Sequence, residues 1–344
     1  MPADRTLKVL VGVIAAILVT GAAYQASGVL APLTLALFII AIVWPLQRAL
    51  QSRMPALLAL AITVIVTVAV CLGFASLAVW AFGRVGRSLI ADSQRYQAFY
   101  DAAVAWLEDR GISVAGLWAE HFNAGWALGV ARQITGRANT TLSFWLITLV
   151  YVILGLLEVD DVGRKVKALR NREAARILMD ATAATADKFR KYMIVRTQMS
   201  VVTGVLVWAL AWGVGLQFPF EWGVIAFVLN YIPFIGPFIA TIFPTLLAMT
   251  QFSSWQAVLG VFAGLNLIQF VVGSYIEPRV SGDVLSISPF VVLFAVVAWT
   301  YLWGWYGAFI GVPIVIAILT FCEYHPASRF VADLLSGPAP PARA

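Results

Sequence analysis

The sequence predicts an all-α polytopic membrane protein, and three observations support this prediction. Of the 344 residues, 61% are hydrophobic and only 12% are charged, whereas about 25% are charged in a typical soluble protein. The apolar residues form long blocks, and several blocks exceed the roughly 20 helical residues that cross a bilayer core. From Trp222 to Ile276 the chain contains no Asp, Glu, Lys or Arg, although prolines and glycines interrupt this run.

The apolar blocks predict about eight membrane segments. The charge-free stretch 9–47 contains a turn-like Gln-Ala-Ser-Gly at its middle and is therefore read as two helices. A cleaved signal peptide at the N-terminus is disfavoured, because further membrane segments follow at once. In order, the predicted regions are 1–83 with segments one to three, 84–139 as an insert, 140–158 with segment four, 159–196 as a basic helical segment, 197–320 as the transport core and 321–344 as a C-terminal tail.

Two regions outside the apolar blocks indicate how the chain is oriented. Residues 84–139 mix acidic, basic and Trp side chains, so we expect an extracytoplasmic or interfacial insert with an amphipathic helix between segments three and four. Residues 159–196 hold ten of the 23 Lys and Arg residues. By the positive-inside rule this segment is cytoplasmic, and counting spans from it places both termini in the cytoplasm. Such a cluster, diluted by acids, is expected to meet anionic lipid and not nucleic acid.

Two apolar segments of the transport core are too long for one perpendicular crossing. Residues 222–250 would extend about 43 Å as a continuous helix, and Asn-Tyr-Ile-Pro-Phe-Ile-Gly-Pro interrupts them at 230–237. Residues 290–320 are interrupted in a comparable way by Trp-Gly-Trp-Tyr-Gly at 303–307. Paired, interrupted hydrophobic segments are typical of transporters whose solute site lies near the midplane, and they indicate an internal repeat.

Two topologies are compatible with these segments. Either both long segments cross the membrane, which gives eight spans with residues 274–289 outside, or both fold back as re-entrant hairpins with residues 274–289 inside. The C-terminus is cytoplasmic in both cases, and charge bias does not decide between them because 274–289 contains a single arginine. The central position of each interruption slightly favours the re-entrant pair.

Motifs in the last third of the chain resemble those of a known family. Ile-Pro-x-x-Gly-Pro begins at Ile232, Glu-Pro-Arg-x-x-Gly begins at Glu277, and Gly-Val-Pro begins at Gly311. Together with the long insert before segment four, this order resembles the autoinducer-2 exporter (AI-2E) family of bacterial membrane proteins. The resemblance implies an inner-membrane transporter that effluxes a small hydrophilic signalling molecule of quorum sensing, or, in some relatives, exchanges cations for protons.

One departure from the family pattern bears on the transported solute. Members of the family commonly carry an acidic residue a few positions before the Pro of the Glu-Pro-Arg motif, whereas this chain has Val272 in that stretch. If that acid couples proton or cation movement in relatives, this chain lacks it. A neutral hydrophilic solute such as autoinducer-2 is therefore expected, with a cation-proton antiporter as the alternative.

The candidate pathway residues each have a structural alternative. Asn230 could bond solute hydroxyls, or it could cap the end of its helix or bond a neighbouring helix. Two amides one helical turn apart share a face and line an interior or bond a partner helix. Glu277 and Arg279 could form an ion pair or an anchor to lipid headgroups, or they could have a gating or substrate-binding role. The predicted substrate pathway consists of Asn230, Pro233, Gly236, Pro237, Asn266, Gln269, Glu277, Arg279, Gly304 and Gly307.

The sequence argues against several other protein classes. Its two cysteines lie in apolar segments and its two histidines are far apart, so no disulfide framework, metal site or cofactor is expected. An intramembrane enzyme is disfavoured because no His-Glu-x-x-His motif or intramembrane catalytic pair is present. A passive channel or membrane scaffold remains an alternative. The expected partners are a small hydrophilic solute and membrane lipids, and a homo-oligomer is compatible with the sequence.

Overall fold

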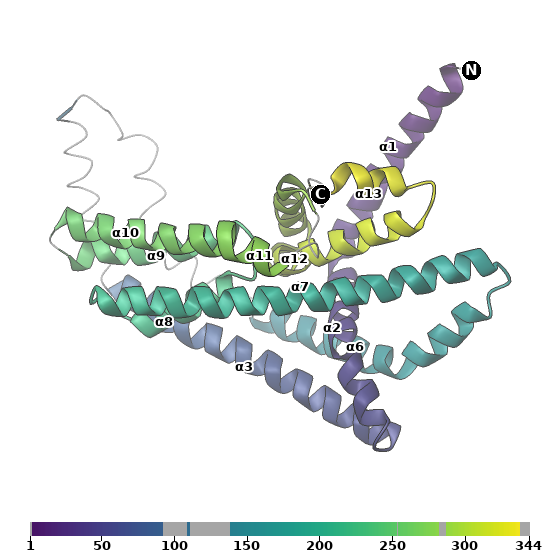
Figure 1. The fold of residues 1–344 in the computed structure, drawn as a ribbon, viewed down its shortest axis with the longest axis horizontal. Helices are drawn as coiled ribbons and strands as arrows, with labels where there is room; N and C mark the ends of the chain where they lie inside the picture. Colours follow the sequence, from purple (N-terminus) through teal and green to yellow (C-terminus); the bar gives the residue numbers. More distant parts are fainter. Residues whose placement is uncertain (1, 92–108, 111–137, 253, 282–286, 338–344) are drawn as a thin grey trace, which may run out of the picture. The chain divides into compact units, whose positions relative to one another are not determined.

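The computed structural model describes most of the chain as helices (Figure 1). The described residues are 2–91, 109–110, 138–252, 254–281 and 287–337. Within them the secondary structure is helical, apart from an isolated bridge between Ile287 and Ser336. The all-α prediction is therefore confirmed for this part of the chain, whereas most of the predicted insert 84–139 lies outside the described residues.

The chain divides into two compact units. The first unit comprises Met1–Thr67, Leu142–Tyr192 and Asp283–Ala344. Within it, α12 packs against α1, α2 and α13, and one of its cores forms where α2, α3 and α6 bring Ile40, Leu60 and Val152 together. Its elements are α1 (Pro2–Gln25), α2 (Ser27–Gln51), the start of α3 (Ala56–Ala91), α6 (Ala138–Lys167), the first half of α7 (Arg172–Gly213), α12 (Pro289–Tyr324) and α13 (Arg329–Leu335).

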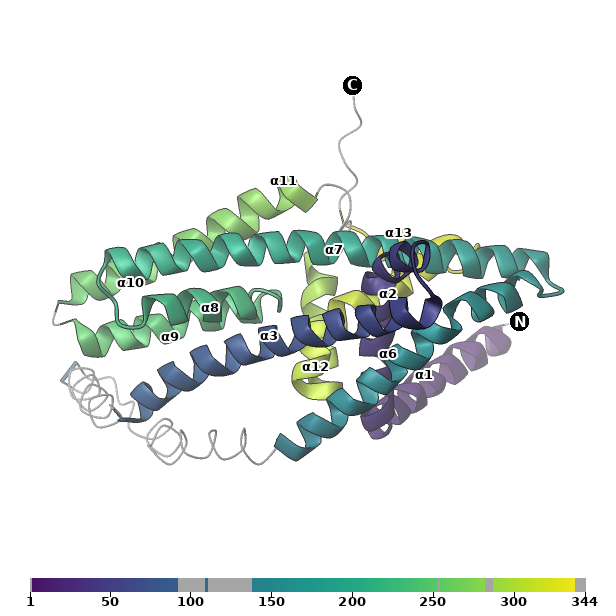
Figure 2. The same ribbon diagram turned by 90° about the horizontal axis from the view of Figure 1, so that it is seen from below.

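The second unit comprises Val68–Thr141 and Met193–Gly282. In this unit α8 packs against α9, and α9 packs against α10, as Figure 2 shows. Trp222 is 1% exposed and belongs to a core that α3, α7, α8, α9 and α10 build together. Its elements are the rest of α3 and α7, then α8 (Pro219–Leu229), α9 (Ile235–Gln251), α10 (Trp255–Phe270), a π-helix (Val271–Ile276) and α11 (Glu277–Ser281).

Two glycines bring α7 and α8 into backbone contact. A Cβ added to Gly223 would lie 2.8 Å from the carbonyl oxygen of Gly204, and one added to Gly204 would lie 2.8 Å from the carbonyl oxygen of Gly223. The side chains of Trp208 and Phe227 flank the contact, because their Cβ atoms lie within 3.0 Å of the same two added positions. Small residues of this kind allow membrane helices to approach closely.

The helices do not end where the charge pattern changes. α3 continues past residue 83 to Ala91, α6 runs through residue 158, and α7 runs through residue 196. The boundary at 139–140 also lies within α6 and that at 320–321 within α12, so all five predicted regional boundaries fall inside helices. Glu, Lys, Arg and Ala are good helix formers, so a change from apolar to charged residues alters the surroundings of a helix without ending it.

Six described helical segments are long and apolar enough to cross a membrane, and the chain is a multi-pass membrane protein. By contrast, α8 has only 11 residues and would be about 16 Å long, too short to cross a hydrocarbon core of about 30 Å. α9 is also shorter than the candidate spans. The six segments are Ser27–Gln51, Ala56–Ser88, Leu142–Lys167, Arg172–Gly213, Trp255–Val280 and Pro289–Tyr324.

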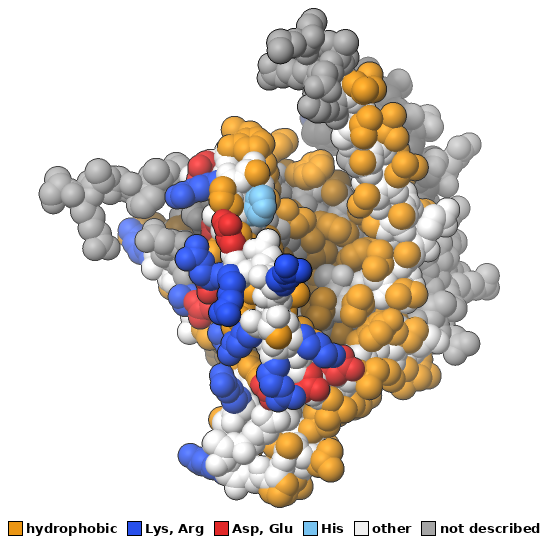
Figure 3. Space-filling model, turned by 90° about the vertical axis from the view of Figure 1, so that its right-hand side faces the viewer, with side chains coloured by type: hydrophobic (Ala, Val, Ile, Leu, Met, Phe, Trp, Pro, Cys, Tyr) orange, Lys and Arg blue, Asp and Glu red, His pale blue; other side chains and the backbone are white. Residues whose placement is uncertain are grey.

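Basic side chains gather where α6 ends and α7 begins, in the first unit. Figure 3 shows Lys and Arg side chains on this face beside extensive apolar surface. Asn171 caps α7, because its Oδ1 accepts hydrogen bonds from the backbone N–H groups of Glu173 and Ala174. The basic residues of this region are Arg164, Lys165, Lys167, Arg170, Arg172 and Arg176.

Candidate solute pathway

The first long apolar segment folds back on itself at residues 230–234. α8 ends at Leu229 and α9 begins at Ile235, with Phe234 in a left-handed conformation at φ 62° between them. Gly236 packs against the end of α8, because an added Cβ would lie 1.9 Å from the carbonyl oxygen of Leu229. Only glycine fits there. Pro237 lies in the first turn of α9, where its missing N–H leaves no hydrogen bond unmade.

The two ends of this segment lie together. The side chain of Gln251, at the end of α9, accepts a hydrogen bond from the backbone N–H of Gln217 and donates one to the carbonyl of Gly215. Residues 215–217 connect α7 to α8, so α9 returns to the level at which α8 starts. Together α8 and α9 form a helical hairpin, called here the first hairpin, with its base at residues 215–221 and its tip at residues 230–234.

The second long apolar segment folds back in the same manner around Gly304. This residue has φ 62° and ψ −142°, a region essentially restricted to glycine. A Cβ added to Gly307 would lie 1.8 Å from the carbonyl oxygen of Trp299, and one added to Gly311 would lie 3.0 Å from that of Ala295. In a straight helix residues 295 and 311 would be about 24 Å apart. α12 is thus a second hairpin with its tip at Trp303 and Gly304.

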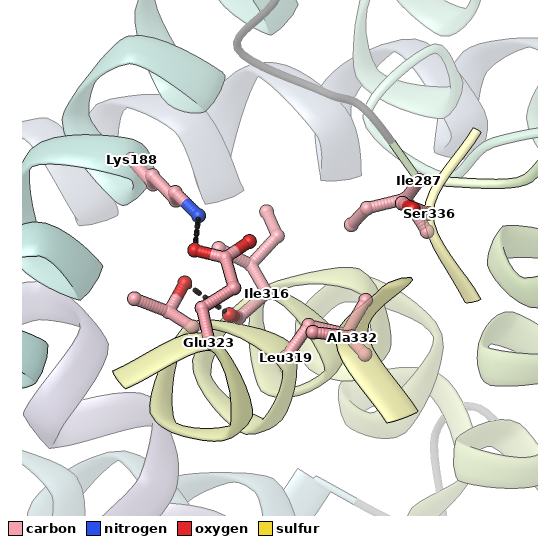
Figure 4. Close-up of a pocket in the computed structure, with 8 residues that line it drawn as sticks. Lys188, Ile287, Ile316, Leu319, Glu323, Ala332 and Ser336 are labelled. Carbon is pink, nitrogen blue, oxygen red and sulfur yellow. Dashed lines mark hydrogen bonds and ion pairs between the residues drawn. The ribbon is translucent and has the colours of Figure 1, made fainter. Parts of the chain in front are cut away.

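The base of the second hairpin is held together in the first unit, as Figure 4 shows. Lys188 of α7 donates a 2.7 Å hydrogen bond to the Glu323 carboxylate near the end of α12. At the start of α12, the backbone N–H of Ser288 donates to the carbonyl of Leu335 in α13. The chain before α12 therefore lies beside the chain that follows it.

Polar side chains attach the tip of the first hairpin to α7. The Asn230 Nδ2 lies 3.3 Å from the Ser200 Oγ, and both residues are buried. The Tyr231 hydroxyl lies 3.0 Å from the Thr197 Oγ1 in a more exposed position. Asn230 thus makes the interhelical hydrogen bond that was the structural alternative to a direct solute contact. Pro233 is buried in the same turn.

Aromatic side chains surround the tip of the second hairpin. The Trp303 Nε1 donates to the carbonyl of Ala23 at 3.0 Å. The rings of Tyr306 and Phe144 stack with centroids 3.6 Å apart. Gly304 and Gly307 therefore shape a backbone turn among aromatic rings, and the described polar side-chain contact of Trp303 is made by its indole N–H.

The two amides predicted on α10 differ in exposure. Asn266 is exposed, and its Nδ2 donates to the carbonyl of Phe262 one turn earlier in the same helix. Gln269 is half-buried. An amide that can reach the carbonyl of its own preceding turn has no need of a partner helix, which the sequence pattern alone does not reveal.

Glu277 and Arg279 do not pair with each other. The Glu277 carboxylate lies 3.1 Å from the Arg196 guanidinium, which is on α7 and mostly buried. Arg279 instead lies over the ring of Tyr275, with its Cζ 3.4 Å from the centroid, and donates to the Tyr275 carbonyl. Of the alternatives given for these two residues, the structure shows an ion pair of Glu277, and its partner is Arg196 on another helix.

A π-helix aligns Glu277 with its partner. Pro278 has no N–H and would clash with the carbonyl of Ser274 in a regular helix, and the chain widens into a π-helix over Val271–Ile276 immediately before this point. Such segments are frequent at functional sites. On the same stretch Val272 is buried against Val195 and Met199 of α7.

A second ion pair between helices, in which the acid is buried, was not predicted from the sequence. Glu221, the residue immediately before the charge-free run, is 5% exposed, and its Oε1 lies 3.1 Å from the Arg84 Nη1 on α3. Arg84 also lies over the ring of Trp80 at 5.9 Å. The available signal was the position of Glu221 at the border of the run, which mirrors that of Glu277 at the other border.

Comparison with known proteins identifies the family of the chain. The family model for AI-2E family transporters matches residues 13–327. The chain is 32% identical over 316 residues to the AI-2 transport protein TqsA of Escherichia coli (strain K12), covering 90% of each protein. It is 30% identical over 209 residues to the putative transport protein YhhT of the same organism, covering 60% of this chain and 58% of YhhT.

A third relative comes from a different organism. The putative transport protein YrrI of Bacillus subtilis (strain 168) is 31% identical over 188 residues, covering 52% of this chain and 51% of YrrI. All three relatives are named as transport proteins. With a family match over nearly the whole length, this chain belongs to the AI-2E family of membrane transporters.

Proposed function

We propose that the protein is a carrier that exports a small neutral hydrophilic solute across the bacterial inner membrane, with autoinducer-2 as the first candidate. The observation that carries this proposal is the fold-back of both long apolar segments at a glycine-dependent turn. A turn in apolar surroundings leaves backbone groups that only protein, water or solute can satisfy. The name of TqsA, which specifies AI-2 transport, supports the choice of solute.

Contacts within the second unit support a re-entrant first hairpin. Its two ends meet through Gln251, so the hairpin enters and leaves on one side. α10 then leads to Glu277, which pairs with Arg196 at the end of the basic segment. Residue 277 is thereby on the side of that segment, as the re-entrant topology requires and the crossing topology does not.

The same reasoning applies to the second hairpin inside the first unit. Its base lies beside Lys188, which belongs to the basic segment. Its tip bonds the carbonyl of Ala23, near the C-terminal end of α1. If the basic segment is cytoplasmic, the second hairpin enters from the cytoplasm and the first from outside. Opposite entry is the arrangement of an inverted repeat.

The surroundings of Val272 favour a neutral solute over a proton-coupled cation. Val272 is 2% exposed and packs on apolar residues of α7, so an acidic side chain at this place would be costly to ionise. The acids at both borders of the uncharged run are held in ion pairs with arginines. We therefore place cation-proton exchange behind neutral-solute export.

Transport by the purified protein tests the proposal. Extracellular metabolites of deletion and overexpressing cells are compared first, and the solute that differs is then loaded into proteoliposomes. We expect efflux of autoinducer-2 that saturates with concentration and is competed by unlabelled solute. Non-saturating flux of unrelated solutes would indicate a passive channel and contradict the carrier.

Side-specific labelling tests the topology. Cys71 and Cys322 are replaced by Ser, and Val280, which is exposed, is replaced by Cys. We expect a membrane-impermeant maleimide to label Val280→Cys in inside-out vesicles and not in intact cells. Labelling in intact cells would contradict the re-entrant hairpin and favour a crossing.

A further inference from the structure

Both borders of the uncharged run carry an acidic residue that is paired with an arginine on another helix. Glu221 precedes the run and pairs with Arg84, and Glu277 follows it and pairs with Arg196. All four residues belong to the second unit. The pair of Arg84 with Glu221 is called here the entrance pair, because Glu221 lies at the base of the first hairpin, where the chain enters it. The pair of Arg196 with Glu277 is called the tip pair.

The entrance pair fastens the start of the first hairpin to α3. Glu221 lies in the first turn of α8, where the helix dipole favours a negative charge. The Arg84 side chain is 54% exposed while that of Glu221 is 6% exposed, so the pair lies at the border between water and the packed interior. Trp80 and Phe220 pack edge to face beside it, which adds an apolar contact between the same two helices.

The tip pair lies at the opposite end of the hairpin. Arg196 directly precedes Thr197, whose hydroxyl bonds to Tyr231 of the hairpin tip. Its side chain is 10% exposed and that of Glu277 is 20% exposed, and its Nη1 contacts both carboxylate oxygens at 3.1 and 3.2 Å. This pair ties α7 to the chain that follows the π-helix.

We propose that the residues of the entrance pair and of the tip pair are positioning residues that close opposite ends of the first hairpin, and that transport opens one pair at a time. This inference rests on the proposed export function. The physical reason is that a buried charge without its partner is costly unless water reaches it. A pair therefore opens only towards a water-filled mouth, and the other pair keeps the far end dry.

A buried cysteine between the two pairs reports which end opens. Thr203 of α7 is 0% exposed and belongs to the same unit, and it is replaced by Cys in the chain that lacks Cys71 and Cys322. Labelling with an impermeant maleimide is measured from each face, in intact cells and in inside-out vesicles. This measurement requires no knowledge of the solute.

We expect opposite results from the two arginine variants. Arg84→Gln should raise the labelling rate of Thr203→Cys from the outside only, and Arg196→Gln should raise it from the cytoplasmic side only. Each increase should be at least about fivefold, the lower end of an ordinary conformational coupling. Arg164→Gln, which removes an exposed ion pair on α6, is the matched control and should change neither rate.

Equal increases from both faces, or no increase from either, would overturn the inference. A variant that merely loosens the fold would be labelled equally from both faces, so the asymmetry separates positioning from structural support. A reducible bifunctional methanethiosulfonate reagent that links Arg84→Cys to Glu221→Cys gives a second test, because the cross-link should stop export until it is reduced. Full export by the cross-linked protein would overturn the role of the entrance pair as a gate. Absence of export by the unmodified protein would instead overturn only the proposed function.

Discussion

The first and the second hairpin share a backbone design and differ in the chemistry of their tips. In both, a glycine packs on the carbonyl of the last turn before the break, at Gly236 on Leu229 and at Gly307 on Trp299. The first tip is attached by an amide and a hydroxyl. The second is attached by an indole N–H and stacked rings.

This difference indicates that the two halves of the predicted repeat have different roles, one in solute binding and one in rigidity. Hydrogen bonds of a neutral amide or hydroxyl can be exchanged for those of a hydrophilic solute, because the groups involved have similar bonding capacity. Ring stacking offers no such exchange and instead holds the tip in place. We therefore expect solute selectivity to depend on the first hairpin and rigidity on the second.

The shared design predicts the largest effect. Gly236→Ala and Gly307→Ala each force a Cβ onto a backbone carbonyl, and overpacking of this kind costs about 1–3 kcal/mol or more. Both variants should yield much less monodisperse protein and a lower melting temperature in detergent. Gly260→Ala is the control, because no atom lies within 4 Å of its added Cβ. A normal melting temperature for one glycine variant would break the equivalence of the hairpins.

The second tip predicts the next largest effect, on stability alone. Trp303→Phe removes the hydrogen bond to the Ala23 carbonyl and part of a buried ring. Loss of a buried hydrogen bond costs about 1–2 kcal/mol. We expect a lower melting temperature with an unchanged KM for export in proteoliposomes. A raised KM at normal stability would assign solute contact to the second hairpin as well.

The first tip predicts a smaller effect that appears in the transport kinetics. Asn230→Ala should raise the KM about threefold to eighteenfold, since a polar interaction in a membrane bundle is worth roughly 0.6–1.7 kcal/mol. Ser200→Ala is the matched variant, because it removes the same interhelical bond and keeps the amide. Equal KM values for the two variants would show that Asn230 serves α7 and not the solute.

The smallest effect is expected at Tyr231. Tyr231→Phe removes only the hydroxyl that bonds Thr197 near the surface, and such a bond contributes about 0.6 kcal/mol on average. Export should fall by less than about threefold, which corresponds to that energy. A complete loss of export by Tyr231→Phe would show that the tip depends on this hydroxyl and not on Asn230.

Local features were predictable from the sequence and contacts between distant residues were not. The breaks at 230–237 and 303–307 follow from proline and glycine, whose backbone preferences act within a few residues. The pairing of Arg196 with Glu277 joins positions 81 residues apart, and that of Arg84 with Glu221 joins two different helices. Pairing partners depend on helix packing, so the sequence marked Glu277 as a candidate without identifying its arginine.

The glycine contact between α7 and α8 has a mechanical consequence. Most helix pairs interlock through side chains, so one helix cannot slide past the other without many rotamer changes. Gly204 and Gly223 put bare backbone against bare backbone, and Trp208 and Phe227 stand on the flanks of this contact. Each of these two side chains lies one helical turn from the glycine of its own helix and on the same face. They therefore block α8 from sliding along α7, and the contact fixes the register of the first hairpin on α7.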